Sequence, residues 1–298
     1  MTQEQKTNNK QRSATEIIVA EGFDLTAPSS SEPPSLPMVR DVVIRMPTRH
    51  NTKLQQIIDR VNQDDELYMF WRCANINAVD RLGMSDHGPV HVQIVSNIGL
   101  KLLRLLINQG IVPSIVTNHA LTNDDAEIVV VLGALMHDLG MAIHRDDHER
   151  FSLILATMKL RELLDGIYDV AARTVIMSEV LHAIISHRSD GRPLTLEAGV
   201  VRIADALDIA KGRSRIAFEA GKINIHSLSA AAIDHIEIQQ GDHKPVRIVV
   251  DMLNSAGVFQ IDELLKEKLS GSGLEPYMEI VATIKGETEK KLVEVFRV

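Results

Sequence analysis

Histidine and aspartate residues in the middle of this 298-residue chain are the first candidates for chemistry. The chain has 12 histidines, and most of them fall in one stretch. Eight lie between residues 87 and 187: His87, His91, His119, His137, His144, His148, His182 and His187. Imidazole and carboxylate groups bind iron, manganese and zinc, and a bound divalent ion activates water at neutral pH. The histidine excess therefore indicates metal chemistry.

The adjacent pair His137-Asp138 is the strongest single signal. It follows the apolar run 129–136, which is typical of a buried helix. An unpaired buried carboxylate is costly and both residues are poor helix formers, so a metal-binding role is favoured over a structural one. The alternative is a polar pair that ends a helix. His91 lies beside an apolar helical stripe, where an ordinary capping or core histidine is also found.

Taken in order, His91, His137-Asp138 and Asp205 resemble the H…HD…D signature of the HD superfamily of metal-dependent phosphohydrolases. The flanks are similar as well, because an apolar helix leads into His-Asp-Leu-Gly and Asp205 lies in Ile-Ala-Asp-Ala-Leu-Asp. The resemblance covers about residues 85–212. It implies a helical fold and a divalent transition metal (Mn, Fe, Ni or Zn), as one or two ions. These four residues would hold the first ion.

Two further segments resemble members of the superfamily that bind two metals. Residues 147–152 are similar to their third-histidine region, and residues 187–193 to part of the HD-GYP phosphodiesterase motif. This partial resemblance implies that His148 and His187 hold a second ion, with Asp138 as the bridge. It also makes Asp138 and His187 the expected catalytic residues. The alternative for both histidines is a solvated loop.

Three positions depart from the HD-GYP pattern. Met141, Arg188 and Arg192 stand where those proteins have lysine, histidine and tyrosine, so cyclic di-GMP is not the expected substrate. Arginine and lysine bind phosphate, and we predict that Arg188 and Lys211 contact the substrate. An ordinary charged surface is the alternative for each.

Four residues near the predicted ligands keep open roles. His87 is expected in the loop before its helix, outside the direct ligands. His144 lies four residues before His148 and could replace or assist it. His182 is turned away from the ligand face of its helix. Asp208 either supports a ligand or is a helix-terminal charge.

Helices must present these side chains, and apolar periodicity over residues 49–221 predicts them. They are expected near 54–61, 92–106, 126–136, 150–164, 170–185 and 196–209, with an N-cap cluster at 122–125. From residue 222 the period falls to two, which predicts strands near 223–225, 236–238, 246–250, 278–284 and 291–296, with a helix at 257–269. The expected fold is mainly α: an HD-type helical bundle with a smaller C-terminal α+β domain.

Three domains are predicted. Residues 1–48 form a polar, flexible segment that includes short β-like runs at 16–20 and 42–46. Residues 49–221 form the catalytic helical domain. Residues 222–298 form the α+β domain, which carries no catalytic motif and is assigned to dimerisation or regulation.

Composition limits the classes of partner. Lys plus Arg total 32 and Asp plus Glu total 40, for a net charge of −8. With aromatic residues at 3%, this argues against a nucleic-acid polymer. The net charge is no obstacle for a small phosphorylated substrate, which the resemblance implies. The single cysteine, Cys73, excludes an internal disulfide. No apolar run is long enough to span a membrane, and we expect a cytoplasmic protein. Whether it forms a homo-oligomer is left open by the sequence.

Three functions are consistent with these residues. The first is a phosphatase or phosphodiesterase in which metal-activated water attacks a nucleotide, cyclic nucleotide or other phosphoester. The second is a nucleotide-binding sensor that retains the HD pocket and signals through the C-terminal domain. The third is a metal-dependent oxygenase, because some HD-fold proteins activate oxygen.

Overall fold

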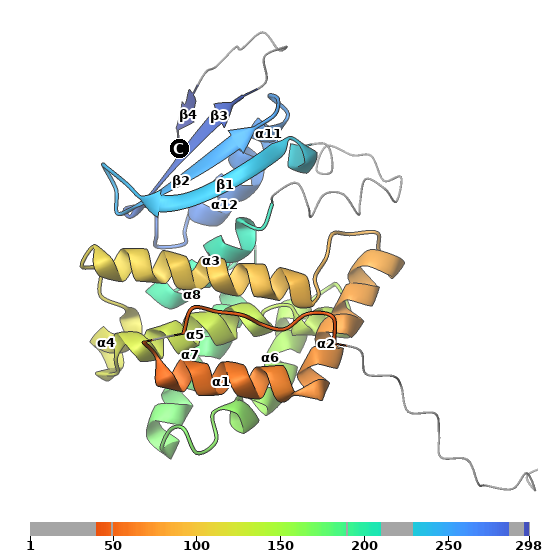
Figure 1. Cartoon of the computed structure of the whole chain (residues 1–298), viewed down its shortest axis with the longest axis vertical. Coiled ribbons are helices and arrows are strands. Elements are labelled where there is room, and N and C mark those ends of the chain that lie inside the picture. The colour runs from red at the N-terminus through yellow and green to blue at the C-terminus, as the bar shows by residue number, and fades with distance from the viewer. Residues whose placement is uncertain (1–39, 49, 189, 210–228, 286–294, 298) are drawn as a thin grey trace, which may run out of the picture. The chain divides into compact units, whose positions relative to one another are not determined.

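The computed structural model describes residues 40–48, 50–188, 190–209, 229–285 and 295–297. In this part of the chain, helices come first and a small sheet follows them (Figure 1). The predicted fold class, a mainly α helical bundle with a smaller C-terminal α+β region, is confirmed.

The bundle lies between residues 52 and 206. Its elements, in chain order, are α1 (Thr52–Gln63), α2 (Asp65–Asn75), the π-helix η1 (Ile76–Arg81), α3 (Pro89–Asn108), α4 (Ser114–His119), α5 (Asn123–Met136), the 3-10 turn η2 (Leu139–Ala142), α6 (His148–Leu163), α7 (Val170–Ser186) and α8 (Leu196–Ala206). Each helix that periodicity predicts in this region is present.

Helix α5 is the centre of the bundle, because every residue from its third position onward is buried. Thr122 and Asp125 form a reciprocal capping box at its start, as the N-cap cluster predicts. Helices α1, α3, α7 and α8 pack around it. A Cβ on Gly99 of α3 would lie 2.9 Å from Cγ1 of Val130, so this glycine allows close approach. The helix that carries His91 therefore lies directly against α5.

Two helices, α2 and α4, were not anticipated. The side chain of Asp64 caps α2 by accepting a hydrogen bond from the backbone N–H of Leu67. Tyr68 and Trp71 are buried on the inner face of this helix. The indole N–H of Trp71 donates to the carbonyl of Leu135 at 2.8 Å, near the end of α5. Helix α2 thus supports the turn that follows α5.

Residues 40–48 form an extended segment that packs on the bundle. Ile44 is only 3% exposed. The side chain of Asn62 accepts from the Ile44 N–H at 2.8 Å and donates to its carbonyl at 2.9 Å. The β-like run 42–46 forms no strand. Side chains of the bundle supply the backbone hydrogen-bond partners instead, Asn62 for Ile44 and Gln93 for Arg45. The run at 16–20 lies outside the described residues.

The C-terminal region contains a sheet with the order β1-β2-β3-β4 among the described residues. Its elements are β1 (Ile233–Gln240), β2 (Val246–Met252), α11 (Gly257–Phe259), the π-helix η3 (Gln260–Leu265), α12 (Lys266–Leu269), β3 (Met278–Ile284) and β4 (Val295–Arg297). Strands β2 and β3 are parallel, and the other two pairs are antiparallel. The predicted helix 257–269 is the crossover that a parallel pair requires. The predicted strand at 223–225 lies outside the described residues.

The C-terminal region contacts two of the helices that bear predicted ligands. Segments η3 and α12 contact α8, and strands β1 and β2 contact α3. Residues 40–298 group as one unit by their internal contacts. The domain boundaries at 48 and 221 remain predictions.

Helix α3 is the one helix of the described chain that is long and apolar enough to cross a membrane. Half of its most apolar window is buried inside the protein. It packs against α5 and α8, as a core helix does.

Candidate metal centre

The pair His137-Asp138 lies where α5 ends and η2 begins. Ser152 of α6 holds this turn, because its hydroxyl donates to the His137 carbonyl at 2.7 Å and accepts from the Gly140 N–H at 2.8 Å. A Cβ on Gly140 would lie 1.9 Å from the His148 carbonyl oxygen, so only glycine lets the turn rest on the start of α6. The turn thereby brings Asp138 next to His148.

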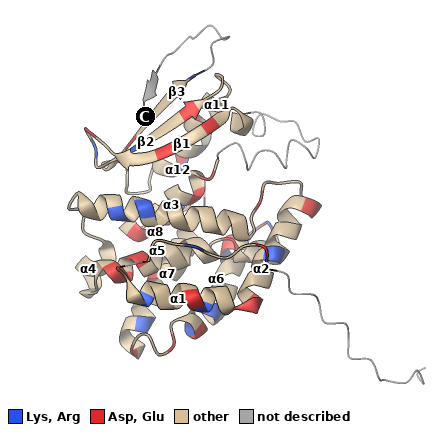
Figure 2. Ribbon diagram, viewed as in Figure 1, with Lys and Arg blue, Asp and Glu red and all other residues tan. Residues whose placement is uncertain are grey.

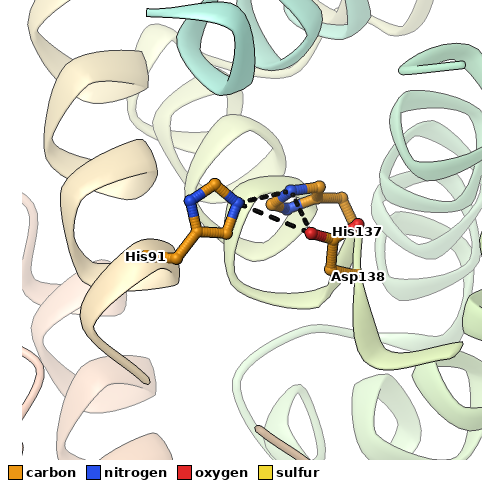
Figure 3. A group of neighbouring side chains, drawn as sticks. All are labelled: His91, His137 and Asp138. Carbon is orange, nitrogen blue, oxygen red and sulfur yellow. Dashed lines mark hydrogen bonds and ion pairs between the residues drawn. The ribbon is translucent and has the colours of Figure 1, made fainter. Parts of the chain in front are cut away.

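Four side chains form what we call the first cluster: His91, His137, Asp138 and Asp205. The Nε2 atoms of His91 and His137 are 3.2 Å apart, and Oδ2 of Asp138 lies 3.5 and 3.3 Å from them. Figure 3 shows these groups converging from α3 and from the end of α5. Oδ1 of Asp205, on α8, lies 3.6 Å from each of the two Nε2 atoms. Three helices thus supply one convergent set of ligand atoms.

A second cluster forms on the other oxygen of the same aspartate. Oδ1 of Asp138 lies 3.2 Å from Nε2 of His148 and 3.6 Å from Nε2 of His187. His148 begins α6 and His187 follows the end of α7, and all three side chains are buried. Asp138 therefore presents one oxygen to each cluster. The solvated-loop alternative does not describe either histidine.

The ring nitrogens that face away from the clusters have acceptors. Nδ1 of His137, His148 and His187 lies 2.8, 2.9 and 2.6 Å from the backbone carbonyl three residues earlier in each case. Nδ1 of His91 lies 2.6 Å from Oδ2 of Asp208. Carbonyl and carboxylate oxygens only accept, so Nδ1 of His91, His137 and His187 carries a hydrogen. Nδ1 of His148 also lies 2.9 Å from the donor Nη1 of Arg145. Each Nε2 therefore faces the cluster, where it would coordinate a metal ion once any hydrogen on it has been released.

The clusters hold concentrated negative charge. Burial lowers the pKa of His137, but the carboxylates of Asp138 and Asp205 raise it to about 10. Burial raises the pKa of Asp138, but His137 and hydrogen bonds from His148 and His187 bring it well below its usual range. The pKa of Asp205 is also lowered well below its usual range, against burial, by His137 and by the charge of Lys268. Both carboxylates are therefore anionic at neutral pH and attract a cation.

The donor set fits divalent metal ions. Ligand atoms bound at about 2.0–2.2 Å to one ion lie roughly 3–3.5 Å from one another. The distances between Nε2 and carboxylate oxygens are 3.2–3.6 Å in the two clusters. Nitrogen and carboxylate ligands suit manganese, iron, nickel and zinc. The clusters are thus compatible with a divalent metal, and the ligand roles of the individual residues remain a prediction.

A cavity of about 200 Å³ opens over the clusters. The lining residues combine ligands and charged side chains: His87, Asp138, Arg145, His148, Glu149, His187, Arg188, Asp205 and Lys268. Arg188, a predicted substrate contact, is among them and pairs with Asp190 at 2.9 Å. Lys211, the other predicted contact, lies outside the described residues. The carboxylates of Asp138 and Asp205 thus share the cavity with three cationic side chains, Arg145, Arg188 and Lys268, which we call the rim cations.

The residues with open roles separate clearly. Asp208 holds the ring of His91, because its Oδ2 lies 2.6 Å from Nδ1 of His91. His87 lies in the loop before α3, lines the cavity and has its ring 5.6 Å from that of His91. His144 is exposed and accepts from the N–H of Asp146 at 3.0 Å, so it does not replace His148.

His182 and His119 lie outside both clusters. Nε2 of His182 accepts from the N–H of Leu194 at 2.9 Å. Nε2 of His119 is 3.4 Å from Oε1 of Glu179. Neither ring belongs to a group of residues that could hold an ion, among the residues that the structure describes.

Sequence reasoning did not identify Arg145, Glu149 or Lys268 as part of the site. Arg145 and Glu149 flank His148 in a charged run, and that proximity was the available signal. Lys268 is 63 residues beyond Asp205, by subtraction of the two positions, and lies on another element. Nothing in its local sequence indicates the site.

Comparison with known proteins identifies the family. The HD domain model matches residues 87–210. The chain is 40% identical over 240 residues to uncharacterized protein MJ1020 of Methanocaldococcus jannaschii. The matched region is 80% of this chain and 92% of the relative. No solved structure matches significantly.

Two relatives named ribonuclease Y are more distant. The protein from Acholeplasma laidlawii is 25% identical over 293 residues, which is 94% of this chain and 51% of that protein. The protein from Desulforamulus reducens is 26% identical over 206 residues, which is 67% of this chain and 36% of that protein. The chain thus spans about half or less of each ribonuclease Y. The family match and the clustered His and Asp residues show that the chain belongs to the HD domain family and indicate a metal-dependent HD hydrolase.

Proposed function

We propose that this protein is a two-metal phosphohydrolase that acts on a small phosphoester, such as a nucleotide, through metal-activated water. The observation that carries the proposal is the division of Asp138 between two histidine clusters, with Oδ2 in one and Oδ1 in the other. A shared carboxylate is the arrangement expected where two ions act on one phosphoryl group. Asp138 and His187 remain the proposed catalytic residues.

Bound divalent ions would lower the pKa of a water molecule and polarise a phosphoryl oxygen. The chain's own groups orient that chemistry. Hydrogen bonds at Nδ1 fix the ring planes of the four histidines, as described above. Arg145 and Arg188 line the same cavity and offer planar donors to phosphate oxygens.

A neighbouring cavity gives room for the organic part of a phosphoester. It has a volume of about 440 Å³, and its lining residues are Asn77, Arg81, Leu82, Ile143, His144, Arg145 and Asp146. Arg145 lines both cavities. Leu82 and Ile143 are exposed apolar side chains in this lining. A mixed apolar and polar surface of this kind favours a small organic group attached to the phosphate.

A small substrate is favoured over an RNA chain by the charge of the protein. The net charge is −8, and Figure 2 shows acidic and basic residues interspersed over the described ribbon in that view. A polynucleotide needs a basic path along its phosphates. The ribonuclease Y relatives make an RNA phosphodiester the second candidate substrate. We propose a cytoplasmic protein with a small phosphorylated substrate and no membrane partner.

The test is a substrate panel on protein loaded with manganese, iron, nickel or zinc. The panel contains nucleoside mono-, di- and triphosphates, cyclic nucleotides, a chromogenic phosphate monoester and diester, and an oligoribonucleotide. We expect turnover of a small phosphoester, its loss in Asp138→Ala, and its retention in His119→Ala, which lies outside both clusters.

Three results would contradict this proposal. Cleavage of the oligoribonucleotide alone would support the RNA candidate. Tight nucleotide binding without turnover by the metal-loaded protein would support a sensor that retains the HD pocket. Loss of metal from His119→Ala would show that the ligand assignment is wrong.

A further inference from the structure

We infer that Lys268, which the C-terminal α+β region contributes, binds the substrate phosphate and completes the wall of the metal cavity. This inference rests on the proposed phosphohydrolase function. It gives the C-terminal region a direct part in the site, beyond dimerisation or regulation.

The position of Lys268 carries the first step. It lies in α12, the end of the crossover between β2 and β3. Its Nζ donates to the backbone carbonyl of His187 and lies 3.7 Å from Oδ2 of Asp205. The other eight residues that line the cavity belong to the helical part of the chain. The C-terminal region therefore reaches the metal centre through this one side chain, among the described residues.

The hydrogen-bonding capacity of the ammonium group carries the second step. An ammonium has three N–H donors. The His187 carbonyl takes one of them, and Asp205 lies at ion-pair distance. The side chain of Lys268 is 20% exposed and lines the cavity. The ammonium group therefore has a donor left for a phosphate oxygen in this cavity.

The charge around Asp205 carries the third step. Its Oδ1 faces the first cluster, whereas its Oδ2 faces Lys268. Metal ligation at Oδ1 would neutralise the carboxylate and leave the ammonium charge for another anion. Arg188 pairs instead with Asp190, and among the described residues Lys268 is the rim cation that forms an ion pair with Asp205.

A buried arginine fixes Lys268 in this position. Arg202 of α8 is only 2% exposed. Its Nε donates to the Lys268 carbonyl at 2.9 Å, and one terminal nitrogen donates to the carbonyls of Arg188 and Gly191. One guanidinium thus ties α12 to the loop that carries Arg188. Two cations of the rim are positioned by the same buried group.

The experiment compares Lys268→Met with Lys266→Met, using inorganic phosphate as the probe. Lys266 lies in the same helix, is 53% exposed and pairs with Asp262, so it is a matched control. Phosphate binding to the manganese-loaded protein is measured by calorimetry, beside metal content and thermal unfolding. We expect Lys268→Met to bind phosphate about tenfold or more weakly, because a charge-assisted hydrogen bond is lost. Metal content should be unchanged, and Lys266→Met should match the wild type.

Steady-state kinetics with the substrate identified in the panel distinguish a phosphate-binding role of Lys268 from a purely structural one. We expect Lys268→Met to raise KM more than it lowers kcat, and Lys268→Arg to restore much of the phosphate affinity. Unchanged phosphate binding in Lys268→Met would overturn the inference. Loss of metal would also overturn it, because Lys268 would then act on Asp205 alone. If wild-type protein turns over a phosphoester while Lys268→Met is unaffected, the inference fails and the proposed function stands.

Discussion

Removal of the Asp208 carboxylate should weaken metal binding in the first cluster selectively. Oδ2 of Asp208 lies 2.6 Å from Nδ1 of His91, and His91 is fully buried. This contact fixes the ring so that Nε2 faces the other ligand atoms. Asp208 is itself only 6% exposed, so solvent does not replace the lost acceptor.

The size of the effect follows from the kind of hydrogen bond. A hydrogen bond to a charged group contributes about 1.5–3 kcal/mol, and each 1.4 kcal/mol corresponds to about tenfold in affinity. Loss of the partner of a metal-ligating histidine costs about 10–100-fold in metal affinity. Asp208→Ala should therefore weaken one ion by about 10–100-fold. The contact of Asp208 is with Nδ1 of His91 in the first cluster, so the second cluster (Asp138, His148 and His187) should keep its ion.

The assay is calorimetric titration of metal-free protein with manganese, with two binding steps fitted separately. Asp208→Asn is the conservative variant, because its amide oxygen still accepts from Nδ1 and should retain more of the affinity. Asp242→Ala is the control for loss of an exposed carboxylate, since this residue pairs with Arg247 away from the site. Equal weakening of both ions, or no change in either, would refute the reasoning about His91.

Three further predictions concern charge and packing. The carboxylates raise the pKa of His137 from 6.5 to about 10, so this ring carries an extra proton at neutral pH. Metal binding at pH 7.5 should therefore release about one proton. Metal affinity should then increase with pH up to about 10. Calorimetry in buffers of different ionisation enthalpy measures how many protons are released per ion bound. Release of no proton would contradict the raised pKa of His137. Lys159→Met should lower the free energy of unfolding by about 1–3 kcal/mol, because the Lys159 side chain is 3% exposed and pairs with Asp64 at 2.8 Å. Urea titration measures the change, and an unchanged unfolding midpoint would show that the ion pair does not stabilise the fold. Gly140→Ala should lower the free energy of unfolding by about 1–3 kcal/mol and displace His148 from Asp138, because the added Cβ would lie 1.9 Å from the His148 carbonyl oxygen. Full metal content in this variant would contradict the packing argument.

The helices of the site could be predicted because their sequence signals are local. The capping residue Thr122 and the apolar stripe around Val95 mark α5 and α3 directly, and the structure places both helices there. The fold class follows from the change of apolar period near residue 222. Helix α2 was missed although Asp64 and the spacing of Tyr68 and Trp71 carried the same kind of signal.

The candidate site could be predicted only as far as its motif residues. The convergence of His91, His137 and Asp138 was expected from their resemblance to the HD signature, and the structure brings these side chains together. Lys268 could not be found, because its place in the site depends on how the crossover of the C-terminal sheet packs on α8. Long-range packing of this kind leaves no pattern in the local sequence.

The division of Asp138 between two clusters is tested most directly by metal content. Purified protein, loaded with manganese and freed of excess metal, is analysed by elemental analysis beside three alanine variants. We expect two ions per chain in the wild type, one in His91→Ala, one in His148→Ala and none or nearly none in Asp138→Ala. A wild-type protein with one ion, or an Asp138→Ala variant that retains both, would contradict the account.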